Sequence, residues 1–350
     1  MPILDQKNAQ ERLEVEQFLQ SHPNGWFTQS LQWPRVKQDC ASEVVYTRAA
    51  SGAVNAAAVV LFRQAPLLKR PFLYAPRGPV VDWADQGAVN QILDEIDSAA
   101  QAQKAYKILI DPFIMADDAP LIQFLQSRGY RLEQASEEDG RQSGFAYILP
   151  LEGRSVEEVF QAFHSKWRYN IRLASKKNVV CKICGPEAVE DFYPLWAETG
   201  KRDGFPIRSK SYLVNLMETL GGHCRLYLCY LDGEPLSGAL AIQYAGKTSY
   251  VFGASSEHHR EAMPNYLVQM EMIRWAVESG CSLYDFGGLP GYHPGSESQG
   301  GIYRFKRGFG GKVVRYTVGF SNVKAPVLDC FVRGGGWLRG KLQDLRMHRR

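Results

Sequence analysis

The sequence predicts an α/β (α+β) fold made of two tandem domains related by internal duplication. The chain has 350 residues, which is too long for one average domain. Hydrophobic residues make up 45% of it and aromatic residues 12%, enough for buried cores, and a charged fraction of 22% excludes a disordered chain. Helical and strand patterns alternate along the sequence, and parts of the pattern occur twice.

Three elements of the first half recur in the same order in the second half. Each joins a turn or a helix to an apolar strand. The matched pairs are 52–62 with 233–244, 74–79 with 250–255, and the strand ending at Asp111 with the strand ending at Asp285. All three pairs are displaced by nearly the same number of residues. This favours duplication over chance similarity, although any two α/β domains share such parts.

The break between the two domains is predicted near 150–153, where a strand-like segment meets a new helix. Ser155, with Glu158 three residues later, is typical of a capping box that begins this helix. The expected domains are 1–150 together with 316–350, and 151–315. Helices are predicted at 86–104, 155–177, 186–200 and 262–279, and strands at 43–49, 54–63, 107–111, 144–150, 224–231, 236–244 and 247–253.

Cysteine usage and hydropathy indicate a reduced, cytoplasmic protein. The seven cysteines are spread out, and their odd number argues against a disulfide framework. The N-terminus lacks the apolar core of a signal peptide, and no run approaches the roughly 18 apolar residues of a membrane span. Cys181 and Cys184 lie in a strand-like segment that points them to opposite faces, and Cys224 and Cys229 have the wrong spacing for zinc. No metal site is therefore expected.

The segment 263–311 gives the clearest indication of a binding site. Pro264 is suited to the first turn of a helix, which leads into a strand that ends at the carboxylate of Asp285. A loop rich in glycine and serine follows, and it carries Lys306 and Arg307. Because glycine lets a ligand approach the backbone closely, this loop predicts a site for an anionic substrate.

Positive charge is concentrated locally rather than globally, since the net charge is only +4. In the predicted helix over 155–177, three cations recur at every fourth residue and line one face: Arg168, Arg172 and Lys176. Trp167 and Ile171 lie on an adjacent stripe that is expected to pack inward. A row of cations without acidic partners suits phosphodiester binding, but a solvated helix face is an equally good interpretation.

Four further segments are distinctive when taken together. They are H-P-N-G-W-F-T-Q-S-L-Q-W-P-R-V-K (22–37), Y-A-P-R-G-P (74–79), K-W-R-Y-N-I-R-L-A-S-K-K-N-V (166–179) and G-F-P-I-R-S-K-S-Y (204–212). With 263–311 they run in the order typical of the FemABX family, the bacterial non-ribosomal peptidyltransferases, and they span most of the chain. Each segment alone is a weak sign, but the combination specifically resembles this family.

The resemblance implies a fold of two GNAT-like acyltransferase domains, here without the long helical arm of larger members. It also implies transfer of Gly, Ala or Ser from aminoacyl-tRNA to a peptidoglycan precursor, either UDP-MurNAc-pentapeptide or lipid II. An aminoacyl ester is already activated, so no ATP, metal or other cofactor is expected. The protein is expected to be a monomer. A basic tail from Arg333, with Trp337, Leu338 and Leu342, permits peripheral contact with the inner face of the membrane.

The resemblance also assigns catalytic residues. The lysine at the position of Lys306 is implicated in catalysis in the family, and the preceding aromatic, here Phe305, lies near the tRNA acceptor end. Arg307 is a further candidate for contact with tRNA. Asp111 ends a buried strand, where α/β sheets bind ligands, and could accept the proton of the acceptor amine. The alternatives are a surface lysine in a turn for Lys306 and a turn cap for Asp111.

Residues matching the family's precursor-binding positions are Lys37, Arg208 and Tyr212. Tyr250 is a further candidate, since a tyrosine in this strand region contacts the sugar-peptide in the family, although the alternate position here is Phe252. Ser209 is typical of an N-cap, which places Arg208 and Tyr212 at a helix N-terminus suited to phosphate. Phe252 lies two residues from Tyr250 and is expected to be core. The alternatives are a solvated helix face for Lys37 and core packing for Tyr250.

Two other functions compete with tRNA-dependent transfer. The first is a GNAT enzyme using acetyl-CoA, which would hold the pyrophosphate with the motif [QR]-x-x-G-x-[GA] at a helix N-terminus. The one match begins at Arg141 and leads into a strand, so we interpret it as accidental. The second is a non-catalytic protein that binds RNA or a membrane surface through its basic segments.

Overall fold

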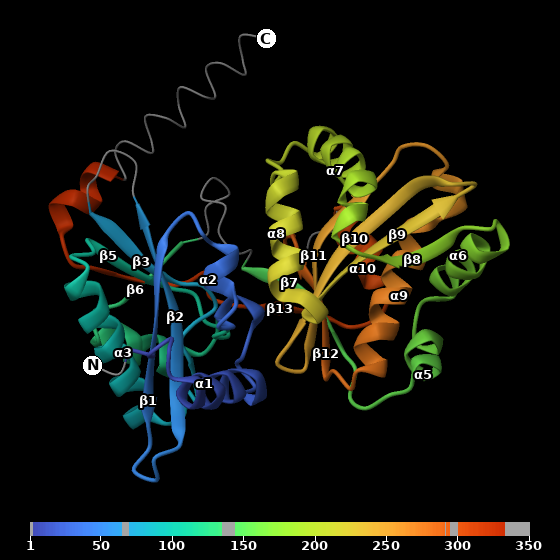
Figure 1. Ribbon diagram of the computed structural model, residues 1–350. Coiled ribbons are helices and arrows are strands. Elements are labelled where there is room, and N and C mark those ends of the chain that lie inside the picture. Colours follow the sequence, from blue (N-terminus) through green and yellow to red (C-terminus); the bar gives the residue numbers. More distant parts are fainter. Residues whose placement is uncertain (1–2, 65–69, 135–143, 291, 295–299, 333–350) are drawn as a thin grey trace. The chain divides into compact units, whose positions relative to one another are not determined.

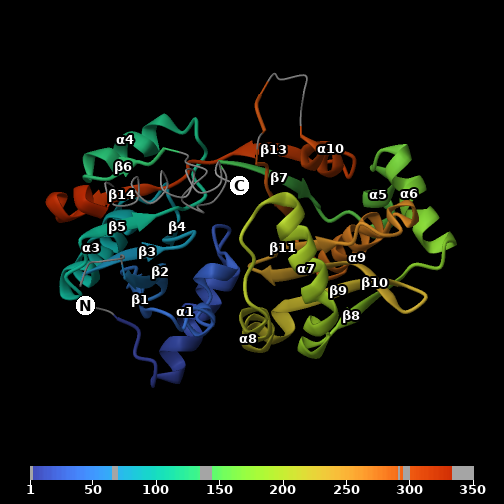
Figure 2. The same ribbon diagram turned by 90° about the horizontal axis from the view of Figure 1, so that it is seen from above.

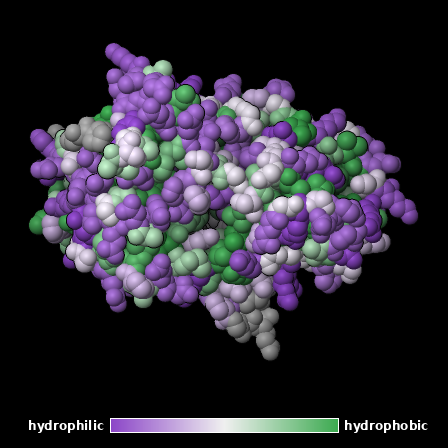
Figure 3. All heavy atoms as spheres, turned by 90° about the horizontal axis from the view of Figure 1, so that it is seen from below, coloured by the Kyte–Doolittle hydropathy of each residue, from purple (hydrophilic) through white to green (hydrophobic). Residues whose placement is uncertain are grey.

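The computed structural model describes residues 3–64, 70–134, 144–290, 292–294 and 300–332. The chain forms two compact units. Unit 1 comprises Met1–Gly144 and Arg315–Arg350, and unit 2 comprises Phe145–Val314. No helix among the described residues is long and apolar enough to cross a membrane. On the face drawn in Figure 3, hydrophilic residues cover most of the surface.

The core of unit 1 is a mixed sheet covered by helices on both faces (Figure 1). In spatial order the strands are β1 (Ala41–Arg48), β2 (Val54–Gln64), β3 (Pro71–Ala75), β5 (Lys107–Ile110), β14 (Phe320–Val323) and β6 (Arg131–Leu132), with β4 (Val80–Val81) paired to β2. The helices are α1 (Ala9–Ser21), α2 (Trp33–Val36), α3 (Gln86–Ala102) and α4 (Ala119–Ser127). The apolar run of β2 is buried on both sides, where alternate residues face α3 and α1.

Unit 2 repeats this arrangement with a second sheet (Figure 2). Its strands run β13 (Lys312–Arg315), β7 (Phe145–Pro150), β12 (Leu283–Gly288), β11 (Lys247–Ser255), β10 (Glu234–Tyr244), β9 (Cys224–Leu231) and β8 (Val180–Cys184). One face packs against α5 (Val156–Gln161), α6 (Ser165–Lys176) and α9 (Pro264–Glu278), and the other against α7 (Val189–Asp203) and α8 (Lys210–Leu220). The short helix α10 (Gly301–Arg307) precedes β13.

The two sheets have the same order of parallel and antiparallel strand pairs. In unit 1, β1–β2 and β2–β3 are antiparallel, β3–β5 is parallel and β5–β14 is antiparallel. In unit 2, β9–β10 and β10–β11 are antiparallel, β11–β12 is parallel and β12–β7 is antiparallel. A long helix also precedes the inner parallel strand in both units, α3 in one and α9 in the other.

The boundary between the units lies at Gly144 and Phe145, six residues before the expected break. Strand β7 pairs with β12, and this pairing places it in the second sheet rather than the first. Strand β14 follows unit 2 in the sequence but lies between β5 and β6 of unit 1. In each sheet, therefore, the inner parallel strand pairs with a strand that is distant from it in the sequence, β5 with β14 and β12 with β7.

The predicted helix over 155–177 is two helices. The capping box of Ser155 and Glu158 is present and begins α5. The helix stops before His164, whose N–H donates to the carbonyl of Gly308 at 2.9 Å and whose side chain caps α6. A contact with a residue far along the chain therefore interrupts an otherwise continuous helical pattern.

Other differences are local. Helices α1 and α4 lie outside the predicted ranges, and the strand expected to end at Asp285 continues to Gly288. The segment carrying Lys306 was expected to be a loop, but it is helix α10. Flanking glycines hid a short helical run, I-Y-R-F-K-R, that starts directly after Gly300 and Gly301.

Candidate functional site

Lys306 is a buried residue on α10, with 6% of its surface exposed. Its Nζ donates to the carbonyl of Gly288 at 2.7 Å and lies 3.4 Å from that of Gly287. These contacts contradict the alternative interpretation, in which Lys306 is a surface lysine in a turn. A lysine held by backbone carbonyls at the end of a strand has a fixed position, as a catalytic group requires.

The surroundings of Lys306 weaken its affinity for a proton. Burial lowers the pKa of Lys306 to about 8, because the charged form is poorly solvated, while the negative charge of Asp285 raises it. Asp285 is itself buried, and its Oδ1 accepts a hydrogen bond from the N–H of Gly287 at 2.7 Å. At neutral pH, Lys306 is therefore a charged ammonium that titrates just above the physiological range.

Lys306 lies where two parallel strands separate. The pairing of β11 with β12 extends only over 247–249 and 283–285. Beyond it β11 has a bulge, because Ala241 of β10 faces Tyr250 while Leu240 faces Phe252, which leaves Val251 unpaired. The C-terminal ends of parallel strands are where α/β sheets bind ligands, so this position suits a reacting group.

The same bulge decides the environment of Tyr250. Tyr250 packs against the core cluster on the α9 face, whereas Phe252 lies 5.4 Å from the ring of Trp196 of α7, on the other face. Burial raises the pKa of Tyr250 to about 12. A Cβ on Gly253 would come within 1.6 Å of the Tyr250 hydroxyl, so glycine gives this ring its space. Phe252 is a packing residue, as expected, and does not share the surroundings of Tyr250.

Phe305 connects α10 to the basic helix α6. Its carbonyl accepts a hydrogen bond from Nε1 of Trp167 at 2.9 Å, and its ring lies 5.2 Å from the rings of both Tyr266 and Phe309. The inward packing predicted for Trp167 and Ile171 is present. The main chain at Phe305 is therefore held directly next to Lys306 by a residue of α6.

The cations on α6 differ in their contacts. Nη1 of Arg168 donates to the carbonyls of Gln161 and Phe163, so this side chain caps α5. The Arg172 guanidinium lies 5.2 Å from the ring centroid of Phe160 and remains exposed. Lys176 is exposed in the last turn of α6, and on α10 Arg307 is exposed too. Unit 2 thus joins Lys306 to a basic surface of exposed side chains.

In unit 1, Asp111 lies just after β5 and is 3% exposed. Its Oδ2 accepts a hydrogen bond from the Tyr74 hydroxyl at 2.9 Å, and its Oδ1 accepts one from the backbone N–H of Arg77. Burial raises the pKa of Asp111, while Arg77 and these hydrogen bonds oppose the shift. Asp111 therefore fixes the turn at Arg77, whatever role it has with a substrate.

Gln29 holds the same turn from the other side. It is fully buried; its Nε2 donates to the carbonyls of Pro76 and Val59, and its Oε1 accepts from the N–H of Val59. A Cβ on Gly78 would lie 2.7 Å from this amide. Two of the distinctive segments, 22–37 and 74–79, are therefore in contact. The buried role of Gln29 was not recognised, although the residue stood in a quoted segment.

The remaining predicted binding residues lie at helix ends. Lys37 is the C-cap of α2, and its Nζ lies 5.2 Å from the Trp33 ring centroid. Ser209 is the N-cap of α8, as predicted, and accepts a hydrogen bond from the N–H of Tyr212 at 3.2 Å. Arg208 is exposed, with its guanidinium 5.4 Å from the Tyr212 ring. Arg208 and Tyr212 thus act as a pair at one helix N-terminus in unit 2.

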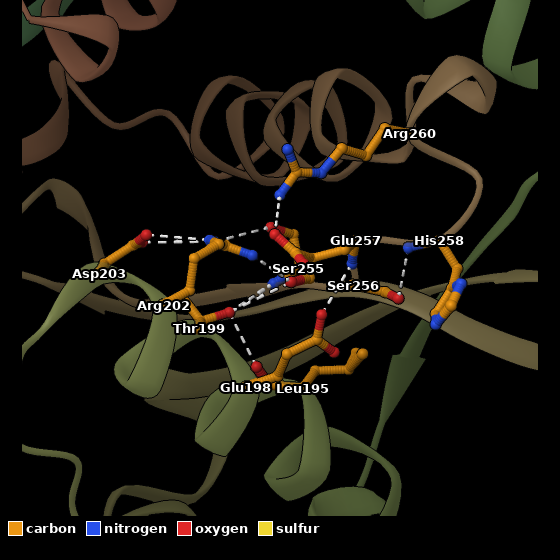
Figure 4. Close-up of polar contacts among 10 residues, drawn as sticks. All are labelled: Leu195, Glu198, Thr199, Arg202, Asp203, Ser255, Ser256, Glu257, His258 and Arg260. Atoms are coloured by element: carbon orange, nitrogen blue, oxygen red, sulfur yellow. Dashed lines mark hydrogen bonds and ion pairs between the residues drawn. The ribbon is translucent and has the colours of Figure 1, made fainter.

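The turn from β11 to α9 is occupied by the protein's own hydrogen bonds (Figure 4). Arg202 of α7 donates to the carbonyl of Ser255, and Thr199 hydrogen-bonds both the N–H and the carbonyl of that residue. The N–H of Glu257 donates to Glu198, and that of His258 to Ser256. Further N–H groups along the turn also have backbone acceptors: Ser256 to Leu236, Ala262 to His259 and Met263 to Arg260.

The basic tail lies outside the described residues, and so do positions 141–143 of the match at Arg141. The rest of that match runs into strand β7, which begins at Phe145, as predicted. Among the residues that the structure describes, no group of histidine, cysteine and acidic side chains could hold a metal ion. Cys224 and Cys229 are buried, and Cys181 faces Cys229 across β8 and β9.

Comparison with known proteins adds a family and a set of relatives. A model of the FemAB family matches residues 10–234, and a model of an acetyltransferase (GNAT) domain matches 162–307. Curated relatives include lipid II:glycine glycyltransferases of Staphylococcus haemolyticus and Staphylococcus aureus. Each is 27% identical to this chain over 85% of its length and 88% of the relative.

Solved structures agree with the architecture. The crystal structure of FemX superposes with a TM-score of 0.84 at 25% identity and covers 95% of this chain and 100% of that one. A tandem GNAT protein from the clavulanic acid biosynthesis pathway superposes with a TM-score of 0.55 at 11% identity, over 91% of this chain and 96% of that one. The predicted fold of two tandem GNAT-like domains is confirmed.

Proposed function

Because this chain belongs to the FemAB family and is an aminoacyltransferase, we propose that it transfers an amino acid from aminoacyl-tRNA to the stem-peptide amine of a peptidoglycan precursor. The observation that carries this proposal is the fixed, buried ammonium of Lys306, whose helix is bound through Trp167 to the basic helix α6. The arrangement combines a catalytic cation with a surface for a polyanion.

The chemistry follows from the ester. The acceptor amine attacks the aminoacyl carbonyl carbon, and negative charge develops on the carbonyl oxygen of the tetrahedral intermediate. The ammonium of Lys306 has three N–H donors, of which one is held at 2.7 Å by Gly288 and a second lies at longer range from Gly287. A third donor remains to stabilise the oxyanion. The C–O bond to the tRNA ribose then breaks, the proton that the attacking amine loses is balanced by the proton that the ribose oxygen takes up, and the new amide remains on the acceptor.

Two groups of residues are assigned to the substrates. We assign the binding of the tRNA backbone to four cations: Arg168, Arg172, Lys176 and Arg307. We assign contact with the acceptor end of the tRNA to Phe305. We assign the binding of the precursor to Lys37, Arg208, Tyr212 and Tyr250. We assign to Asp111 the role of accepting the proton of the precursor's amine. The relatives named as lipid II:glycine glycyltransferases support glycine and lipid II over the other amino acids and UDP-MurNAc-pentapeptide. We place the reaction on the cytoplasmic side of the membrane.

The GNAT fold makes acyl-CoA the natural alternative donor, so the turn before α9 is informative. In GNAT enzymes the helix N-terminus at such a turn receives the pyrophosphate of the cofactor through backbone N–H groups. Here the N–H groups of Glu257 and His258 already have acceptors (Figure 4), and that of Ser256 donates to the carbonyl of Leu236. The guanidinium groups of Arg260 and Arg202 are already paired with Glu257 and Asp203, at 3.0 and 2.9 Å, so neither cation is left for a pyrophosphate. These features favour tRNA over acyl-CoA as the donor.

The test compares Lys306→Ala with Arg304→Ala, a neighbouring cation that is exposed on the same helix. Each variant is incubated with labelled glycyl-tRNA and either lipid II or UDP-MurNAc-pentapeptide, and with labelled acetyl-CoA in a parallel reaction. We expect wild type and Arg304→Ala to transfer glycine, and Lys306→Ala to lose at least 100-fold in rate, as loss of one oxyanion donor costs about that much. Unchanged transfer by folded Lys306→Ala, or transfer only from acetyl-CoA, would contradict the proposal.

A further inference from the structure

The turn 76–79 of unit 1 presents a buried positive charge that the assigned functions leave unused. Arg77 is 7% exposed, and its Nε has no hydrogen-bond partner among the described residues. Its Nη1 only approaches the backbone carbonyl of Asp111, at 3.4 Å. The Asp111 carboxylate accepts from the backbone N–H of Arg77 and from Tyr74, and within the described part of the chain no carboxylate forms an ion pair with the guanidinium.

The Asp111 carboxylate attracts the guanidinium of Arg77 without forming an ion pair with it, so Nε is left without an acceptor in the part of the chain that the structure describes. Leaving a buried N–H unsatisfied is costly, and native proteins rarely do so. The backbone adds to this cost. Arg77 has φ of 58°, in the left-handed region that non-glycine residues seldom adopt. The conformation is imposed from both sides: Asp111 holds the N–H of Arg77, while Gln29 and Thr28 hold the preceding carbonyl of Pro76 at 2.8 Å each. Strain that is fixed this firmly is typical of a residue placed for a ligand.

Aromatic rings define the surroundings of the guanidinium. Its Cζ lies 4.4 Å from the ring centroid of Phe113, which lies 4.7 Å from the ring of Trp26. Trp26 adjoins Phe27, whose ring lies 5.4 Å from Trp33, and the Lys37 ammonium lies over that indole. A continuous row of rings thus links Arg77 to Lys37 within unit 1. Nε1 of Trp33 is also buried and has no partner among the described residues.

We propose that Arg77 binds an oxyanion of the acceptor substrate and positions that substrate in unit 1. The Nε edge of a guanidinium is suited to a carboxylate or a phosphate, and the ring of Phe113 restricts where this planar group can lie. The proposal rests on the proposed function, because it takes the acceptor to be a peptidoglycan precursor that carries a diphosphate and a stem peptide, as both lipid II and UDP-MurNAc-pentapeptide do. Such an acceptor offers two sources of oxyanion, the diphosphate and the peptide carboxylates.

The test uses Arg77→Lys, which keeps the charge but loses the fork, and Arg77→Gln, which loses both. Arg63→Lys is the matched control, because Arg63 also stacks on a phenylalanine of unit 1, at 5.8 Å from Phe72, but is exposed. Binding to the full chain is measured by titration calorimetry with UDP-MurNAc-pentapeptide, with UDP alone and with the free stem peptide. Thermal unfolding of every variant is recorded in parallel.

We expect Arg77→Lys to bind the pentapeptide precursor about tenfold more weakly than wild type, as expected for loss of a bidentate contact, and Arg63→Lys to bind normally. The fragment that Arg77→Lys also binds more weakly identifies the source of the oxyanion. Weaker binding of UDP indicates a phosphate, and weaker binding of the stem peptide indicates a carboxylate. If wild type binds the precursor and folded Arg77→Lys binds it equally well, Arg77 is only a strut and the inference is wrong, while the proposed function stands. If wild type binds neither the precursor nor its fragments, the inference is wrong, while the glycyl-transfer assay with lipid II decides the proposed function separately.

Discussion

The indole of Trp167 fills the space in which a side chain at Gly308 would lie. A Cβ on Gly308 would come within 2.1 Å of Cε2 of Trp167, far closer than real atoms approach. The same indole donates to the carbonyl of Phe305. One side chain of α6 therefore supports both the residue before Lys306 and the turn after it.

We predict that Gly308→Ala weakens both stability and transfer. The added methyl must displace a packed ring, which costs about 1–3 kcal/mol. Gly301→Ala is the control, because no atom lies within 4 Å of a Cβ there and alanine favours a helix. Urea unfolding and transfer rates should separate the two variants. Equal stability of Gly308→Ala and wild type would contradict the proposed role of Trp167.

The pH dependence of transfer should reveal the charge on Lys306. If the ammonium stabilises the oxyanion, the rate must fall as the pH rises through about 8, the pKa to which burial lowers this group. Lys306→Arg should retain activity at higher pH, because arginine stays charged. Rate profiles over pH 6–10 test this. An alkaline decline that is identical in the two proteins would assign it to another group.

The same shift affects stability in a defined direction. Because the pKa of Lys306 is lower in the folded protein than its usual 10.5, the unfolded chain binds more protons between pH 8 and 10.5. The contribution of Lys306 to the free energy of unfolding therefore rises with pH between pH 8 and 10.5, by on the order of 3 kcal/mol. Chemical unfolding of wild type should show a rise that Lys306→Met lacks. Parallel curves for the two proteins would mean that Lys306 is not desolvated.

The cations of α6 should fall into two classes. The double variant that carries both Arg172→Glu and Lys176→Glu should bind tRNA at least tenfold more weakly than wild type. Its binding should also depend less on salt, because both side chains are exposed. Arg168→Ala should weaken it less and instead cost about 1 kcal/mol of stability, since its Nη1 caps α5. Filter binding over a salt series and thermal unfolding measure both. If the double variant and Arg168→Ala lost the same affinity for tRNA, the division of these cations into two classes would be wrong.

The two units should differ when they are isolated. Residues 145–314 form a contiguous segment that contains every strand of the second sheet, and they should unfold cooperatively on their own. Residues 1–144 lack β14, whose Phe320 is fully buried in the core of unit 1, and they should not. Joining 315–332 to 1–144 by a glycine–serine linker should restore folding. Circular dichroism melts of the three fragments test this, and a cooperative melt of 1–144 alone would contradict it.

Local patterns in the sequence determined much of the secondary structure. Ser155 and Glu158 begin α5, Ser209 begins α8 and Pro264 begins α9, because caps and helix starts depend on residues a few positions apart. The recurring order of turns and strands determined that two similar domains follow one another. The segments at 22–37, 74–79, 166–179 and 204–212 were sufficient to identify the family.

Tertiary structure decided what depends on distant residues. The break between α5 and α6 follows from the contact of His164 with Gly308, and the helix at Lys306 from packing against Trp167. The bulge at Val251 placed Tyr250 and Phe252 on opposite faces, although simple alternation would put them on the same one. Burial, which lowers the pKa of Lys306 and leaves Nε of Arg77 without an acceptor among the described residues, exists only once strands and helices far apart in sequence enclose these residues.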